Sequence, residues 1–182
     1  MPVARDIKPL SDRVLTVPNA LTLFRILMAP VVVALLLAKD DGIALAVFLV
    51  AAITDFLDGR IARRHGPTRI GQMLDPIADR LILSSSAIVL AAHGFLPAWA
   101  VAILVGRDIL TLFGSFVFGG RVRVNPIGKA ATALLMTAVA VVIFEPGELG
   151  DVIFQAGFIL SLVAAALYVL SIFRMLKRGE FR

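Results

Sequence analysis

Residues 19–38, Asn19-Ala-Leu-Thr-Leu-Phe-Arg-Ile-Leu-Met-Ala-Pro-Val-Val-Val-Ala-Leu-Leu-Leu-Ala38, form a nearly continuous apolar stretch. A helix of about 20 apolar residues is long enough to cross the hydrocarbon core of a membrane, which is about 30 Å thick. The stretch therefore predicts a membrane-spanning helix near the start of the chain.

Five further apolar stretches of similar length follow, separated by Gly, Pro and charged residues. They cover residues 42–61, 71–93, 96–118, 127–144 and 152–173. The whole chain has 182 residues, of which 59% are hydrophobic and 17% charged, and its mean hydropathy is +0.94. This composition excludes an ordinary soluble protein. We expect an all-α, polytopic membrane protein in which residues 1–182 form one domain, a bundle of six transmembrane helices.

The basic residues predict the orientation of this bundle, because Lys and Arg accumulate in cytoplasmic loops. With six spans, seventeen of the eighteen Lys and Arg residues fall on one side, and Lys39 alone falls on the other. We therefore expect both termini to be cytoplasmic, in the cytoplasmic (inner) membrane. The same basic residues can also serve only as topology signals and as anchors for anionic lipid headgroups.

Four aspartates lie where apolar helices are expected, at the cytoplasmic ends of the second and third stretches: Asp55, Asp58, Asp75 and Asp79. A carboxylate in a membrane segment is costly and typically marks a functional site. Residues three or four apart share one face of a helix, so each pair projects from one face. Because the connection around residues 66–67 is short, the two helices are expected to be antiparallel neighbours.

Four anions that converge in a pocket of low dielectric repel one another unless cations are present. The chain has no cysteine and only two histidines, so oxygen ligands and hard divalent cations are favoured. The pattern predicts one or two divalent metal ions in a cavity that faces the cytoplasm.

Small and basic residues surround these aspartates. Gly59, Ala62 and Gly71 keep the carboxylate faces open, and Arg63 and Arg69 place positive charge suited to phosphate at the same end. The alternative is structural: the arginines form ion pairs and the small residues ease helix packing.

The run Asp55-Phe-Leu-Asp-Gly-Arg-Ile-Ala-Arg63, followed by Gly71-Gln-Met-Leu-Asp-Pro-Ile-Ala-Asp79, resembles the signature of the CDP-alcohol phosphatidyltransferases, DxxDGxxAR…GxxxDxxxD. All eight fixed residues are present. Seven residues, 64–70, separate the two halves, where the family usually has eight. The likeness extends to the residues that open the first stretch and to Gly106-Arg107-Asp108.

The resemblance implies transfer of a phosphatidyl group from CDP-diacylglycerol to the hydroxyl of an acceptor alcohol, with release of CMP. It implies that Asp55, Asp58, Asp75 and Asp79 hold Mg²⁺ or Mn²⁺, expected as two ions, and that Asp79 is the general base. The nucleotide and diphosphate contacts that it implies are Asn19, Thr22, Gly59, Ala62, Arg63, Thr68 and Gly71. It also implies a homodimer. Small residues such as Ser84 and Gly114 can offer close helix contacts between subunits, or equally pack inside one protomer.

The acceptor is predicted less closely than the donor. The chain looks most like the phosphatidylglycerophosphate synthase and cardiolipin synthase branch, whose acceptors are glycerol 3-phosphate and phosphatidylglycerol. Basic residues at the cytoplasmic ends of the fourth and fifth stretches suit either phosphate-bearing acceptor: Arg107, Arg121, Arg123 and Lys129. The Gly106-Arg107-Asp108 segment favours the cardiolipin branch.

Two other classes of membrane protein also use intramembrane carboxylates. A UbiA-like prenyltransferase has aspartate-rich helices, magnesium and a diphosphate donor, but it usually carries two separated motifs in a longer chain. A non-enzymatic ion transporter needs no Gly59, Ala62, Arg63 or Gly71 at these positions.

Overall fold

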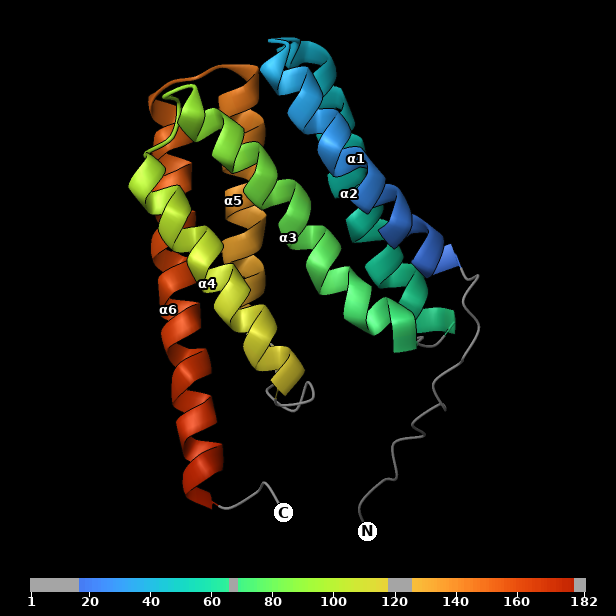
Figure 1. Ribbon diagram of the computed structural model, residues 1–182, viewed down its shortest axis with the longest axis vertical. Helices are drawn as coiled ribbons and strands as arrows, with labels where there is room; N and C mark the ends of the chain where they lie inside the picture. The colour runs from blue at the N-terminus through green and yellow to red at the C-terminus, as the bar shows by residue number, and fades with distance from the viewer. Residues whose placement is uncertain (1–16, 66–68, 118–125, 179–182) are drawn as a thin grey trace.

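The computed structural model describes residues 17–65, 69–117 and 126–178, and these form six α-helices (Figure 1). The helices are α1 (Val17–Leu37), α2 (Asp41–His65), α3 (Arg69–Ala92), α4 (Ala98–Val117), α5 (Pro126–Phe144) and α6 (Glu148–Arg178). Each helix contains most of one predicted apolar stretch, so the all-α prediction is confirmed.

Three of these helices contain segments long and apolar enough to cross a membrane: Ala20–Leu37 in α1, Pro126–Phe144 in α5 and Glu148–Arg174 in α6. The described apolar segments of α2 and α3 are shorter, Asp41–Thr54 and Arg80–Ala92. The motif aspartates of α2 and α3 lie outside these described segments. The structure thus confirms the predicted helices, and three of them have the length and composition of membrane spans.

Tight turns reverse the chain after α1 and after α3. Lys39 adopts a positive φ of 61°, and the amide of Asp40 donates to the carbonyl of Leu35 at 3.0 Å. Gly94 has a φ of 83°, and the amide of Phe95 donates to the carbonyl of Leu90 at 2.9 Å. A left-handed residue and a bond back to the last helical turn satisfy carbonyls that a helix end leaves unpaired. Both helices therefore stop sharply, and the next one returns antiparallel.

The helices pack in two groups that share one hydrophobic core. α1 lies against both α2 and α3, α5 and α6 form a close hairpin, and α3 and α4 connect the groups (Figure 1). Fully buried apolar side chains fill the centre, among them Leu36, Phe48, Leu90, Val139 and Phe154. Over their described lengths α2 and α3 are joined through α1, and they converge where residues 66–68 connect them.

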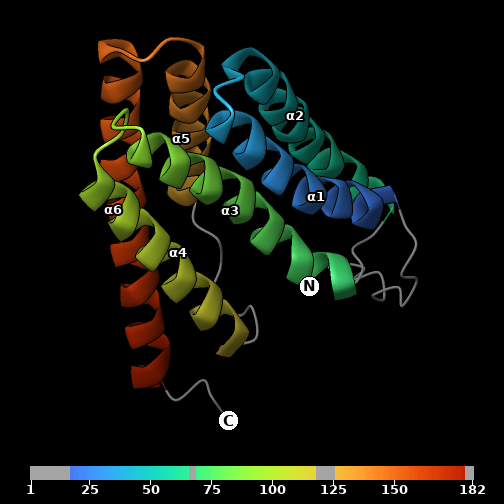
Figure 2. The same ribbon diagram turned by 45° about the horizontal axis from the view of Figure 1, so that its top comes forward.

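The alternating helix directions place functional segments at one end of the bundle, here called the motif end. α2, α4 and α6 finish at this end, and α1, α3 and α5 begin there (Figure 2). The turns after α1, α3 and α5 lie at the opposite end. The motif aspartates of α2 and α3 therefore share an end with the C-terminal halves of α4 and α6.

Candidate active site

The four motif aspartates lie on helices that meet at the motif end. Asp55 and Asp58 belong to the C-terminal half of α2, and Asp75 and Asp79 to the N-terminal half of α3. Three residues connect the two helices, so the helix ends lie within about 15 Å of each other at 3.8 Å per residue. The backbone thus brings both pairs to one end, as predicted. Their side chains lie outside the described ones, among which no group of three or more His, Asp or Glu could hold a metal.

The predicted nucleotide contacts come from α1, α2, α3 and the connection between α2 and α3. Gly59, Ala62 and Arg63 lie in α2 and Gly71 lies in the first turn of α3, but their surroundings are outside the described part. Thr68 belongs to the connection 66–68, which is also outside it.

The first turns of α1 carry polar side chains into the bundle. Asn19 lies in the first turn of α1, and its side chain is outside the described part. Thr22 and Arg25 are completely buried, and each makes an interaction within the chain. They are three residues apart, so they share one face of α1, and α1 packs against both motif helices. A buried arginine in an apolar helix is costly and typically marks a functional or polar site.

A polar group joins α3 to α4 deeper in the bundle, and we call it the Arg80–Asp108 cluster (Arg80, Ser84, Arg107, Asp108 and Thr111). Arg80 Nη1 donates to Asp108 Oδ1 and, at 2.8 Å, to Thr111 Oγ1. Arg107 Nη1 donates to the same carboxylate oxygen of Asp108 at 2.7 Å. Two cations thus share one anion, so the described side chains of this cluster carry one net positive charge.

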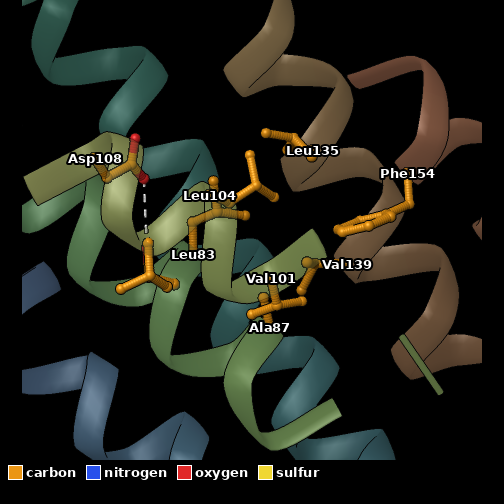
Figure 3. Close-up of a pocket in the computed structure, with 10 residues that line it drawn as sticks. Leu83, Ala87, Val101, Leu104, Asp108, Leu135, Val139 and Phe154 are labelled. Atoms are coloured by element: carbon orange, nitrogen blue, oxygen red, sulfur yellow. Dashed lines mark hydrogen bonds between the residues drawn. The ribbon is translucent and has the colours of Figure 1, made fainter. Parts of the chain in front are cut away.

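Asp108 marks the boundary between this cluster and an apolar cavity. Ser84 Oγ donates to Asp108 Oδ2 at 3.5 Å (Figure 3). Beyond the carboxylate, the cavity is lined by apolar side chains from α3, α4, α5 and α6, among them Leu83, Leu104, Leu135 and Phe154. Its volume is about 10 Å³, about the size of one water molecule. Among the residues that line this cavity, the polar side chains are therefore Ser84 and Asp108.

The residues predicted to bind the acceptor differ in their surroundings. Arg107 is mostly buried and its charge is shared with Asp108, so the polar environment expected for it is present. Lys129, in the first turn of α5, is exposed at the motif end. Arg121 and Arg123 lie outside the described residues.

Sequence reasoning missed the role of Arg80, which it counted only as a cytoplasmic charge. The available signal was its position, because Arg80 follows Asp79 and precedes a long apolar run. It also considered Ser84 and Gly114 for contacts between subunits. Within this chain Ser84 reaches Asp108, and a Cβ at Gly114 would lie 3.0 Å from Tyr168 Oη. Both small residues therefore serve packing inside the protomer.

Comparison with known proteins gives the family. The model of the CDP-alcohol phosphatidyltransferase family matches residues 15–173. A cardiolipin synthase (CMP-forming) of Streptomyces coelicolor is 35% identical over 153 residues, which cover 76% of this chain and 69% of that protein. The human cardiolipin synthase (CMP-forming) is 33% identical over 154 residues, covering 84% of this chain and 50% of that protein.

A putative cardiolipin synthase of Mycobacterium bovis is 36% identical over 127 residues, covering 66% of this chain and 61% of that protein. The matches thus span about half to two thirds of these relatives. The family match includes all six described helices, both halves of the aspartate motif and the Arg80–Asp108 cluster. The chain belongs to the CDP-alcohol phosphatidyltransferase family.

Proposed function

We propose that this protein is a CMP-forming cardiolipin synthase, which transfers the phosphatidyl group of CDP-diacylglycerol to phosphatidylglycerol. The transfer class follows from the family match over residues 15–173, and the names of the similar proteins favour this acceptor over glycerol 3-phosphate. One observation carries the choice: cardiolipin synthases of a bacterium and of humans are 33% to 35% identical to this chain over most of its length.

In the proposed step, a free glycerol hydroxyl of phosphatidylglycerol attacks the phosphorus atom that carries the diacylglycerol. A new oxygen–phosphorus bond forms, the bond between that phosphorus and the bridging oxygen breaks, and CMP leaves with this oxygen. The proton of the hydroxyl passes to a carboxylate, because a neutral alcohol is a poor nucleophile. Asp79 is the proposed base, because it is the last carboxylate of the family motif and lies on α3, one of the two helices that carry the motif.

The aspartates suit a divalent metal by their chemistry. All four are oxygen donors, and Mg²⁺ and Mn²⁺ prefer such ligands. Asp55, Asp58, Asp75 and Asp79 would hold two such ions, which would neutralise charge on the diphosphate and on departing CMP. The convergence of α2 and α3 at the motif end supports this assignment.

The remaining motif residues would bind the donor. Gly59, Ala62 and Gly71 would allow close approach of the cytidine, and Arg63 and Thr68 would contact the diphosphate. Asn19 and Thr22 would add nucleotide contacts from α1, which packs against both motif helices. Arg107, Arg121, Arg123 and Lys129 would attract the acceptor phosphate.

We place all six helices across the inner membrane as one domain, with both termini and a cavity containing the active site on the cytoplasmic side. The alternating directions of the helices and the basic residues near the motif end support this orientation. We also propose that the protein forms a homodimer in the membrane.

An acceptor panel tests the function. Purified protein receives radiolabelled CDP-diacylglycerol with Mg²⁺ and, separately, phosphatidylglycerol, glycerol 3-phosphate, inositol phosphate or serine. Phosphatidylglycerol should give labelled cardiolipin at a kcat/KM at least tenfold above any other acceptor. A preference for glycerol 3-phosphate would instead make the protein a phosphatidylglycerophosphate synthase, the second candidate of the same family.

A further inference from the structure

Two buried hydrogen-bond donors in the C-terminal half of the chain have no partner among the described residues. They are the hydroxyl of Tyr168 on α6 and Nε of Arg107 on α4. The guanidinium Nε–H only donates, and a phenol hydroxyl donates readily. Buried polar atoms of native proteins are nearly always paired, so each unpaired one requires an explanation. Two unpaired donors on adjacent helices indicate an absent acceptor of hydrogen bonds.

Tyr168 reaches the α4 face that carries the Arg80–Asp108 cluster. A Cβ built on Gly114 would lie 3.0 Å from Tyr168 Oη and 3.3 Å from Cε1, so the missing side chain of this glycine leaves room for the phenol. Gly114 follows Thr111 by three residues and therefore lies beside it on α4. Thr111 accepts the hydrogen bond from Arg80 at 2.8 Å.

These residues form a strip along one side of α4. Arg107, Thr111 and Gly114 are four and three residues apart, which places them on one helical face. α3 borders this strip with Arg80, and α6 borders it with Tyr168. The strip is therefore bordered by α3, the helix that also carries Asp79, the proposed base.

The charge of the strip favours an anion. The guanidinium groups of Arg80 and Arg107 both border the strip and donate to the carboxylate of Asp108. Nε of Arg107 still lacks a partner and belongs to a charged group. A hydrogen bond from such a donor to an anion is stronger than one to a neutral acceptor.

The strip lies on the side of α3 away from the proposed nucleotide contacts. Those contacts come from α1, α2, the start of α3 and the connection between α2 and α3, whereas the strip comes from α4 and is bordered by α6. A hydroxyl that attacks near Asp79 from this side belongs to the acceptor. The ligand expected here is therefore the glycerol phosphodiester headgroup of the acceptor lipid.

We propose that Tyr168 is an acceptor-binding residue, whose hydroxyl donates a hydrogen bond to the phosphodiester headgroup held beside Arg107. This inference rests on the proposed function and adds to it a contact from α6 that the sequence motif does not contain. Gly114 is a positioning residue in this arrangement, because its lack of a side chain leaves the space that the phenol of Tyr168 occupies.

Three variants test this contact. Tyr168→Phe removes one oxygen atom and keeps the ring. Gly114→Ala keeps the hydroxyl but displaces it, since the new Cβ crowds Oη. Ser171→Ala is the matched control, because Ser171 lies one turn further along α6 and its hydroxyl is already satisfied by the carbonyl of Leu167 at 2.8 Å.

The KM values for phosphatidylglycerol and for CDP-diacylglycerol are measured in mixed micelles, together with the melting temperature of each variant. A lost hydrogen bond to a charged group should raise the KM for phosphatidylglycerol about tenfold in Tyr168→Phe. Gly114→Ala should raise it in the same direction. The donor KM of both variants and both constants of Ser171→Ala should stay within about twofold of wild type, given that these contacts are unchanged.

A purely structural tyrosine gives a different result. Removing an unpaired buried hydroxyl then leaves both KM values unchanged and keeps or raises the melting temperature, which would overturn the inference. Equal increases in donor and acceptor KM would overturn it as well. Wild-type protein that shows no transfer to any acceptor would instead overturn the proposed function itself.

Discussion

Asp108 of α4 accepts a hydrogen bond from Arg80 of α3, and this pair joins two helices inside the bundle. The same carboxylate oxygen accepts a hydrogen bond from Arg107 at 2.7 Å. The ion pair holds α4 against α3, the helix on which the proposed base Asp79 lies one residue before Arg80. The α3–α4 contact therefore combines this ion pair with apolar packing.

Asp108→Asn should destabilise the protein, because it removes the charged carboxylate to which the guanidinium groups of Arg80 and Arg107 both donate. Loss of a hydrogen bond to a charged partner costs about 1.5–3 kcal/mol, and leaving the charges unpaired adds to this. The free energy of unfolding is measured in detergent for Asp108→Asn, Arg80→Gln and the double variant. The free energy of unfolding should fall less in the double variant than the sum of its decreases in the two single variants. Asp41→Asn is the control, because Asp41 is exposed, and it should leave this free energy nearly unchanged. If the decreases in the free energy of unfolding simply add, Arg80 and Asp108 do not stabilise each other.

Gly150→Ala should weaken the α5–α6 hairpin. A Cβ at Gly150 would lie 2.5 Å from Cγ2 of Val142 on α5, so the helices must separate or the valine must move. Overpacking of this kind costs about 1–3 kcal/mol, and it should lower the melting temperature. Gly42→Ala is the control, because a Cβ there meets nothing within 4 Å. Equal melting temperatures of the two variants would contradict the close contact.

The helices and their order were predictable from the sequence. An apolar run of membrane length must satisfy its backbone hydrogen bonds internally, and an α-helix does so. The aspartate motif was predictable for a similar reason, since charges in apolar helices must serve a site. The role of Arg80 was not predictable, because its partner Asp108 is 28 residues away and the pairing depends on how α3 packs on α4. Tyr168 was missed because a single tyrosine in an apolar helix has no distinctive spacing.

The orientation in the membrane is testable with single cysteines, because the natural chain has none. Lys39 and Lys177 are both exposed and lie at opposite ends of the bundle. In Lys177→Cys, a membrane-impermeant maleimide should label only inverted vesicles, and in Lys39→Cys only right-side-out vesicles. Labelling of both positions from one side would contradict an arrangement in which the motif end is cytoplasmic.

Removal of divalent metal should abolish transfer, because the four aspartates and the diphosphate would then repel each other. Activity is measured after EDTA treatment and again after addition of Mg²⁺ or Mn²⁺, either of which should restore it. Asp58→Asn should require a higher metal concentration for half-maximal rate, whereas Asp151→Asn, at the opposite end of the bundle, should not. Full turnover in excess EDTA would exclude the metal role.

Asp79→Asn should bind CDP-diacylglycerol but fail to turn it over, because the amide retains one oxygen for the metal and cannot accept a proton. Loss of general-base catalysis lowers kcat by about 10²- to 10⁴-fold. Donor binding is measured separately from single-turnover release of CMP. A variant that keeps nearly normal kcat would require another base.

The central claim concerns which molecule supplies each half of the product. CDP-diacylglycerol with deuterated acyl chains and unlabelled phosphatidylglycerol are incubated with the purified protein and Mg²⁺, and the cardiolipin and CMP formed are quantified by mass spectrometry. The proposed reaction predicts cardiolipin with one deuterated and one unlabelled phosphatidyl half, and one CMP for each cardiolipin. Cardiolipin with two unlabelled halves and no CMP, or deuterium that enters a product only when glycerol 3-phosphate is supplied, would contradict it.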